Sequence, residues 1–269
     1  MSERRLRAVL LDWAGTTVDY GSRAPVAVLR EVFAERGITL DDASIRRHMG
    51  LRKFDHLTAL CALPEVQSAW TAAHHRGLGP ADADALYARF EALQPSLLLG
   101  HSHVLPWTPA AVAHFRSMGL RIGSTTGYTR PMLDPLIEQA ACQGYSPDAS
   151  VTPDEAPAGR PFPWMAYLNA LRLQVYPLDA WVKIGDTPSD MEEGRNAGMW
   201  CVGLLVGGNG VGMSEAAWSA LPLLDQVRRK EAVAAQLLSA GAHMVAETLA
   251  DTPAALAILE ERYRAGEKP

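Results

Sequence analysis

Four apolar runs, each followed at once by polar or glycine-rich residues, constrain the fold of this chain more than any other feature. The runs cover residues 6–11, 120–124, 180–185 and 200–206. Helical patterns separate them at residues 108–118, 130–141 and 164–173. Because strands that alternate with helices form a parallel sheet covered on both faces, the sequence predicts an α/β fold with a Rossmann-like parallel sheet.

A second region, residues 25–99, contains no convincing strand and has helical patterns at residues 27–36, 44–60, 66–75 and 82–93. Small and glycine residues at 21–25 and 99–103 flank this region, which is typical of a two-stranded hinge. We therefore expect a core domain of residues 1–21 and 101–269 and an inserted α-helical cap domain of residues 22–100. The last stretch, residues 227–264, is predicted to be helical.

Composition excludes several classes of function. With 30 acidic against 25 basic residues and no long basic block, we expect no nucleic-acid partner. No apolar run approaches the roughly 20 residues of a membrane span, so neither a membrane partner nor a signal peptide is expected. Three widely spaced cysteines fit no disulfide framework, which predicts a cytoplasmic protein.

The residues that follow the apolar runs form a coherent chemical set, because the carboxyl ends of parallel strands meet in one crevice. The set comprises Asp12, Thr125, Thr126, Asp186 and Asp190, with the glycine-rich residues 207–212. Carboxylates and hydroxyls are ligands for a hard cation such as Mg²⁺, which bridges readily to phosphate. Aspartate is also common in turns and at helix N-caps, so each aspartate alone has a structural alternative.

Four ordered segments resemble the motifs of the haloacid dehalogenase superfamily. They are residues 12–17 (Asp-Trp-Ala-Gly-Thr-Thr), 124–128, 159–161 and 185–190 (Gly-Asp-Thr-Pro-Ser-Asp). The resemblance spans almost the whole chain. It implies that Asp12 is a nucleophile, that Thr126 holds phosphate, that a basic residue offsets charge, and that Asp186 and Asp190 serve a metal.

Position 14 departs from the usual pattern, because phosphatases of this superfamily carry an aspartate there that protonates the leaving oxygen, and this chain has Ala14. A positioned acid is worth roughly 10²- to 10⁴-fold in rate. Its absence argues against a phosphate monoesterase, although a degraded phosphatase is an alternative. Lys53 and His56 lie three residues apart in a helical pattern, and hence on one helical face.

Residues 12–16 and 49–56, together with stretches 122–130, 151–154, 157–161 and 191–200, resemble the phosphonatase family of this superfamily. The resemblance implies hydrolysis of the carbon–phosphorus bond of phosphonoacetaldehyde, with a cap lysine that forms a Schiff base. Expulsion of a carbanion from phosphorus needs an electron sink, which a protonated imine on Lys53 would supply. The acid that Ala14 lacks would then not be needed.

Roles for the other residues follow from this resemblance. Asp12, Asp186 and the backbone carbonyl of Ala14 would bind Mg²⁺, with Asp190 in support. Thr126, Gly127 and Arg160 would hold the phosphonate, Met49 and Tyr128 would line the site, and His56 would move protons. A homodimer formed through the cap is also implied. The alternatives are a magnesium-dependent phosphatase or dehalogenase of the superfamily, and a non-catalytic phosphometabolite-binding protein.

Overall fold

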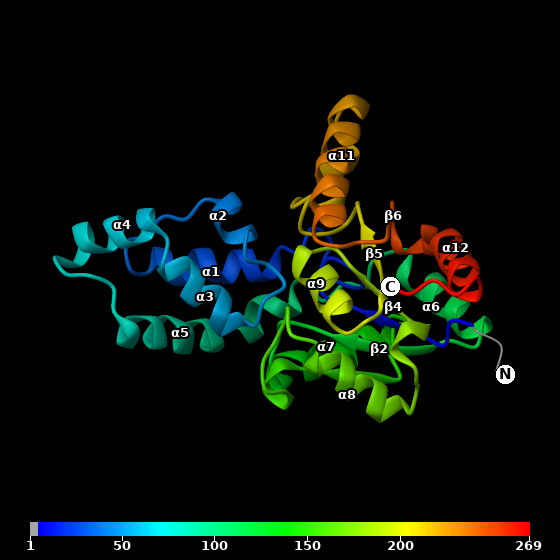
Figure 1. The fold of residues 1–269 in the computed structure, drawn as a ribbon. Coiled ribbons are helices and arrows are strands. Elements are labelled where there is room, and N and C mark those ends of the chain that lie inside the picture. The colour runs from blue at the N-terminus through cyan, green and yellow to red at the C-terminus, as the bar shows by residue number, and fades with distance from the viewer. Residues whose placement is uncertain (1–4) are drawn as a thin grey trace.

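A six-stranded parallel sheet forms the centre of the computed structural model, which describes residues 5–269 (Figure 1). The strand order is β3-β2-β1-β4-β5-β6. The bounds are β1 (Ala8–Leu11), β2 (Arg121–Thr125), β3 (Ala149–Val151), β4 (Trp181–Gly185), β5 (Trp200–Leu204) and β6 (Met244–Ala246). The predicted α/β fold with a parallel sheet is confirmed.

Helices cover both faces of the sheet, as the alternation of side chains along β1 requires. Ala8 and Leu10 belong to a buried cluster on the face that carries α8 (Trp164–Leu173) and α9 (Pro188–Asn196). Val9 and Leu11 belong to the main core, on the face that carries α6 (Thr108–Ser117) and α12 (Thr252–Arg264). The remaining core elements are α7 (Arg130–Cys142), α10 (Glu215–Ser219) and α11 (Leu223–Ser239), with short 3₁₀ turns η1 (Pro153–Glu155), η2 (Leu178–Ala180) and η3 (Leu249–Asp251).

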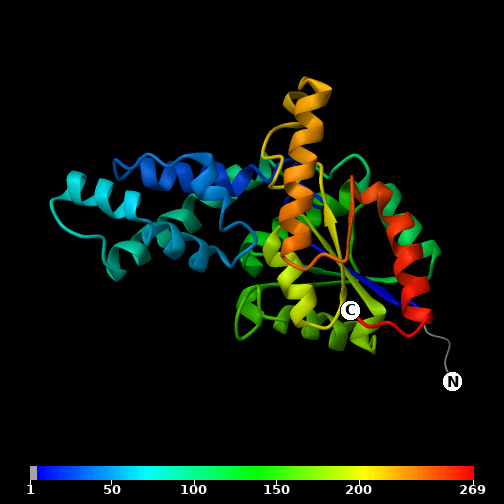
Figure 2. The ribbon, with the colours of Figure 1, turned by 45° about the horizontal axis from the view of Figure 1, so that its top comes forward.

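Five helices form a lobe that lies to one side of the sheet in both views (Figures 1 and 2). They are α1 (Ala24–Ala34), α2 (Asp42–Arg46), α3 (Lys53–Cys61), α4 (Pro64–His74) and α5 (Pro80–Leu99). We call this lobe the cap and the rest of the chain the core. The exact domain limits at residues 22 and 100 stay a prediction, and residues 1–4 of the predicted core segment lie outside the described residues.

Two stretches that were each predicted to be continuously helical are divided in the structure, so those predictions were wrong. Residues 44–60 divide into α2 and α3, because Gly50 between them has a φ of +91°, which ends a helix. Residues 227–264 contain strand β6 between α11 and α12. Both β6 and β3 were missed, because three-residue strands are too short to show a period of two.

Membrane-spanning segments were sought in the part of the chain that the structure describes, and no helix there is long and apolar enough to cross a bilayer.

Candidate active site

Three carboxylates meet where neighbouring strands end. Leu11 of β1 pairs with Ile184 of β4, so Asp12 and Asp186 follow adjacent strands at the same edge of the sheet. Asp190 joins them from the first turn of α9, whose N-cap is the Thr187 side chain. One carboxylate oxygen from each of Asp12, Asp186 and Asp190 lies within 4.8 Å of the others. The convergence expected from strand topology is therefore present.

The Asp186 carboxylate is held by two donors. The Thr16 hydroxyl donates to its Oδ1 at 2.9 Å and the Asn209 backbone N–H donates to its Oδ2 at 2.6 Å. Burial, and then the nearby Asp12 and Asp190 carboxylates, raise the pKa of Asp186 well above its usual value. A divalent cation bound here would offset this repulsion.

The donors at this edge suit a hard cation, because they are carboxylate and carbonyl oxygens. Asp190 is paired with Arg160 and Lys183, and Asp12 and Ala14 line the adjacent cavity. At Gly15, with φ +91°, a Cβ would lie 2.4 Å from Asp186 Oδ2, so only glycine allows the chain this close to the carboxylate. The residues present fit Mg²⁺, and the individual ligand roles of Asp12, Ala14 and Asp186 stay predictions.

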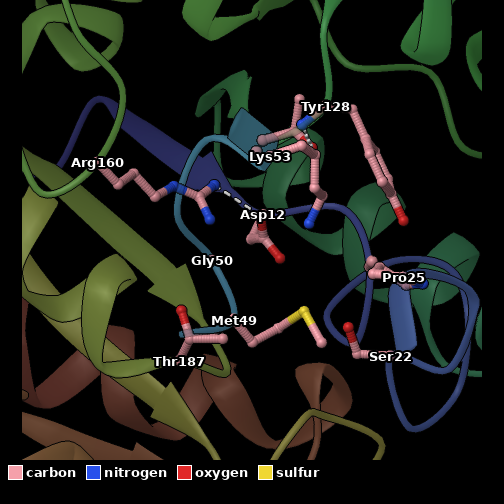
Figure 3. A pocket seen from close by; sticks show the side chains of 12 residues that line it. Asp12, Ser22, Pro25, Met49, Gly50, Lys53, Tyr128, Arg160 and Thr187 are labelled. Carbon is pink, nitrogen blue, oxygen red and sulfur yellow. Dashed lines mark hydrogen bonds and ion pairs between the residues drawn. The ribbon is translucent and has the colours of Figure 1, made fainter. Parts of the chain in front are cut away.

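Arg160 is the centre of a buried ion-pair network. Its Nη2 donates to Asp12 Oδ1 at 2.6 Å (Figure 3), its Nη1 lies 2.9 Å from Asp190 Oδ1, and its Nε lies 3.1 Å from Glu193 Oε2. Burial acts against the charge of Arg160, but Asp12, Asp190 and Glu193 outweigh it and raise the pKa of the guanidinium. Arg160 therefore orients the Asp12 carboxylate and also lines the cavity in front of it.

Lys183 completes this network from below. Its ammonium lies 2.9 Å from Asp190 Oδ1 and 2.7 Å from Glu193 Oε2, and it donates to the Thr125 hydroxyl at 2.8 Å. Thr125 thus serves the network, and its neighbour Thr126 lines the cavity. Sequence reasoning missed Lys183 and Glu193. A lysine within the otherwise apolar strand β4 was the available signal, since lysine is almost never fully buried unless paired.

Lys53 approaches the same place from the cap. It is the first residue of α3 and is 4% exposed. Its ammonium lies 5.0 Å from the centre of the Tyr128 ring, and in Figure 3 the amine points toward Asp12. Burial lowers the pKa of Lys53 to about 8, despite the opposing effect of the Asp12 carboxylate. A neutral amine is therefore accessible near physiological pH.

His56 is fully buried one turn after Lys53 and lies outside the set of residues that line the cavity. Its Nε2 is 2.7 Å from the Ile45 carbonyl, which fixes the proton on that nitrogen, and its Nδ1 has no hydrogen-bond partner. Burial, followed by the charge of Lys53, lowers the pKa of His56 to about 3. Its imidazole is neutral, and its predicted proton-transfer role stays a prediction.

A small cavity separates Asp12 from Lys53. The volume in which the centre of a water molecule can lie is about 20 Å³, which is enough for one or two waters. The cavity is lined by Asp12, Ala14, Ser22, Pro25, Met49, Gly50, Lys53, Thr126, Gly127, Tyr128, Arg160 and Thr187. Ser22, Pro25, Gly50 and Thr187 were not predicted from sequence, because residues of the hinge, the cap and the core meet at this cavity only in the folded chain.

The chain belongs to the haloacid dehalogenase-like hydrolases, whose family model matches residues 6–198. It is 43% identical over 258 residues to a phosphonoacetaldehyde hydrolase from Bacillus cytotoxicus, covering 96% of this chain and 98% of that one. It is 42% identical to a phosphonoacetaldehyde hydrolase from Syntrophobacter fumaroxidans, covering 98% and 95%. The crystal structure of a phosphonoacetaldehyde hydrolase-like protein from Oleispira antarctica superposes with a TM-score of 0.97, at 34% identity over 99% and 97% of the two chains. The similarity to phosphonatases expected from the motifs is confirmed.

Proposed function

We propose that this protein hydrolyses the carbon–phosphorus bond of phosphonoacetaldehyde to give acetaldehyde and phosphate. The observation that carries the proposal is the position of the Lys53 amine, which faces the Asp12 carboxylate across one small cavity. At position 14, where a phosphatase of this superfamily would carry its acid, the cavity wall is alanine. Relatives named phosphonoacetaldehyde hydrolases support the same reaction.

The first step would be imine formation on the cap. The neutral Lys53 amine adds to the substrate aldehyde and, after loss of water, gives a protonated imine. The lowered pKa of Lys53 supports this step because only the unprotonated amine is a nucleophile. His56 Nδ1, which has no other partner, would accept and return protons through a water molecule.

The second step would be phosphoryl transfer on the core. Asp12 attacks phosphorus, the carbon–phosphorus bond breaks, and its electron pair passes to the imine to give a neutral enamine. Protonation of the enamine carbon and hydrolysis of the resulting imine release acetaldehyde and restore Lys53. Water then hydrolyses the phosphoryl group from Asp12, which restores the carboxylate and releases phosphate.

The residues around Asp12 suit this chemistry. Mg²⁺ bound by Asp12, Asp186 and the Ala14 carbonyl would neutralise charge on the transferring group. Arg160, Thr126 and Gly127 line the cavity that the phosphonate would fill. Met49, Gly50 and Lys53 cover this space from the cap and would limit the access of water to the reactive enamine.

A substrate panel tests the proposal. We expect phosphate release from phosphonoacetaldehyde and none above background from p-nitrophenyl phosphate or chloroacetate. Asp12→Asn should abolish phosphate release while borohydride still traps acetaldehyde on Lys53, because imine formation does not use the carboxylate. Turnover of the ester would favour the phosphatase alternative, and tight binding of phosphonoacetaldehyde without any turnover would favour a binding protein.

We also propose that the protein is a homodimer formed through the cap. This proposal rests on the resemblance of the sequence motifs to the phosphonatase family. Sedimentation equilibrium should give twice the chain mass of 29.1 kDa. A single species of the chain mass at the assay concentration would contradict this.

A further inference from the structure

Arg46, the last residue of cap helix α2, reaches across to the core and is not used in the proposed reaction. Its Nη1 donates to the Gly21 carbonyl at 2.9 Å and to Asn209 Oδ1 at 3.0 Å, and its Nη2 donates to the Gly212 carbonyl at 3.0 Å. Asn209 Nδ2 donates back to the Arg46 carbonyl at 3.1 Å. One cap residue is therefore bonded to the hinge and to the core segment 207–212.

The same core segment holds the proposed metal ligand Asp186. The Asn209 backbone N–H donates to Asp186 Oδ2 at 2.6 Å. Gly208 packs so closely against Asp186 that a Cβ would lie 2.4 Å from that residue's own Cβ. Gly21 at the hinge donates to the Gly207 carbonyl at 2.7 Å. Residues 207–212, which the sequence analysis placed among the residues that follow the strands, thus connect the hinge and the cap to the Asp186 carboxylate.

We propose that Arg46 is a positioning residue that couples cap closure to the orientation of Asp186. When the cap closes, the Arg46 guanidinium draws the segment 207–212 into place, and the Asn209 N–H then aligns the Asp186 carboxylate. Closure of the cap and orientation of the Asp186 carboxylate for metal binding then occur together. The proposal rests on the proposed function for the roles of Asp186 and the closed cap.

The chemistry of arginine suits this role. A planar guanidinium directs several donors at fixed angles, so Arg46 contacts four acceptors on two segments at once, the carbonyls of Gly21, Ser22 and Gly212 and the side chain of Asn209. A Cβ at Gly212 would lie 2.8 Å from Arg46 Nε, which shows how closely the segment surrounds the group. Lysine would keep the charge but present all its donors from a single atom, so Arg46→Lys should fail to hold both segments.

Hydrogen exchange of the metal-free full-length protein tests the coupling without reference to catalysis. We expect the peptide containing Asn209 to exchange about tenfold faster in Arg46→Lys and in Arg46→Ala than in the parent. Arg47→Ala is the matched control, because Arg47 is the adjacent residue, is exposed, and should leave the exchange unchanged. Unchanged exchange of this peptide in Arg46→Lys would overturn the proposal.

Magnesium affinity gives the second measurement. Titration calorimetry should show about tenfold weaker Mg²⁺ binding in Arg46→Lys, with no change in Arg47→Ala. Asn209→Ala keeps the backbone N–H but loses the side-chain bonds to Arg46, so it should reproduce the Arg46→Lys effects if the coupling passes through Asn209.

An Arg46→Lys protein with a lowered thermal midpoint but parental exchange and Mg²⁺ affinity would show a purely structural role. If the parent protein failed to cleave phosphonoacetaldehyde, the proposed function would fall while the exchange result still decided the coupling.

Discussion

At the scale of single residues, burial makes the neutral form of the Lys53 amine accessible. An exposed lysine is protonated at neutral pH and cannot condense with an aldehyde. Lys53 is buried where the cap meets the core, beside the Tyr128 ring, and its pKa falls to about 8. The same burial holds its neighbour His56 neutral. The reactive state of the amine is therefore a product of the closed fold.

The pH dependence of imine formation should report this pKa. Protein and acetaldehyde are mixed for a short fixed time at each pH and then quenched with excess borohydride. Because the neutral fraction of a group with a pKa of about 8 rises from about one tenth at pH 7 to one half at pH 8, trapping on Lys53 should rise about fivefold over that interval and level off above pH 9. Lys53→Arg should show no adduct. Trapping that keeps rising past pH 10, or an adduct mapped to another lysine, would contradict the assignment.

Lys183 should matter for stability because it is a fully buried charge with two carboxylate partners. Lys183→Met leaves Asp190 and Glu193 short of a cation, and removing one partner of a buried pair costs about 3–5 kcal/mol. Urea unfolding should show this loss, and adding Glu193→Gln to Lys183→Met should recover part of it. Lys230→Met is the control, because Lys230 has one pair with the half-exposed Glu247 and should cost at most about 1 kcal/mol. A loss below 1 kcal/mol for Lys183→Met would show that the network is dispensable for folding.

At the scale of elements, the loop before α3 fits onto glycines of the core. A Cβ at Gly127 would lie 2.3 Å from the Leu51 carbonyl oxygen, and a Cβ at Gly159 would lie 3.0 Å from Arg52 Cβ. On the cap side, a Cβ at Gly50 would lie 2.5 Å from the Thr187 hydroxyl oxygen. Because these glycines have no side chains, the cap and core backbones approach each other closely, and Lys53 is brought over Asp12.

Gly127→Ala should therefore impair closure without removing any functional group. The added methyl group conflicts with the Leu51 backbone, and a displacement of about 1 Å at a reacting centre costs on the order of 100-fold in rate. We expect kcat/KM for phosphonoacetaldehyde to fall by about that factor, with a thermal midpoint within a few degrees of the parent. Gly77→Ala is the control, because a Cβ there meets nothing within 4 Å. Parental activity in Gly127→Ala would mean that closure tolerates a wider gap.

At the scale of the whole molecule, the site exists only where two lobes meet. The core supplies carboxylates that repel one another, and the cap supplies the Lys53 amine, which points toward Asp12 (Figure 3). The cavity between them has room for only one or two waters. A molecule larger than one or two waters can therefore enter this cavity only if the cap opens.

Metal binding should stabilise the folded protein as well as activate it. Chelation should abolish turnover, and Mg²⁺ at about 100 times its Kd should add about 2.7 kcal/mol to the free energy of unfolding. Asp186→Asn removes a carboxylate that Asp12 and Asp190 repel, so it should abolish the Mg²⁺ effect without lowering the stability of the metal-free protein. Full turnover after exhaustive chelation would indicate a metal-free site.

The sequence by itself determined the parallel sheet, the carboxylates at its edge and the similarity to phosphonatases, because side-chain periodicity and short motifs are local properties. It gave no role to Thr125, and it did not find Lys183, Glu193 or Ser22. Those residues acquire their roles through contacts between distant segments, such as the bond from Lys183 to Thr125 across 58 positions. The tertiary structure decided which charges are paired, which are buried and which face the cavity, since the pKa of Lys53 and the coupling through Arg46 arise only when the cap and core pack together.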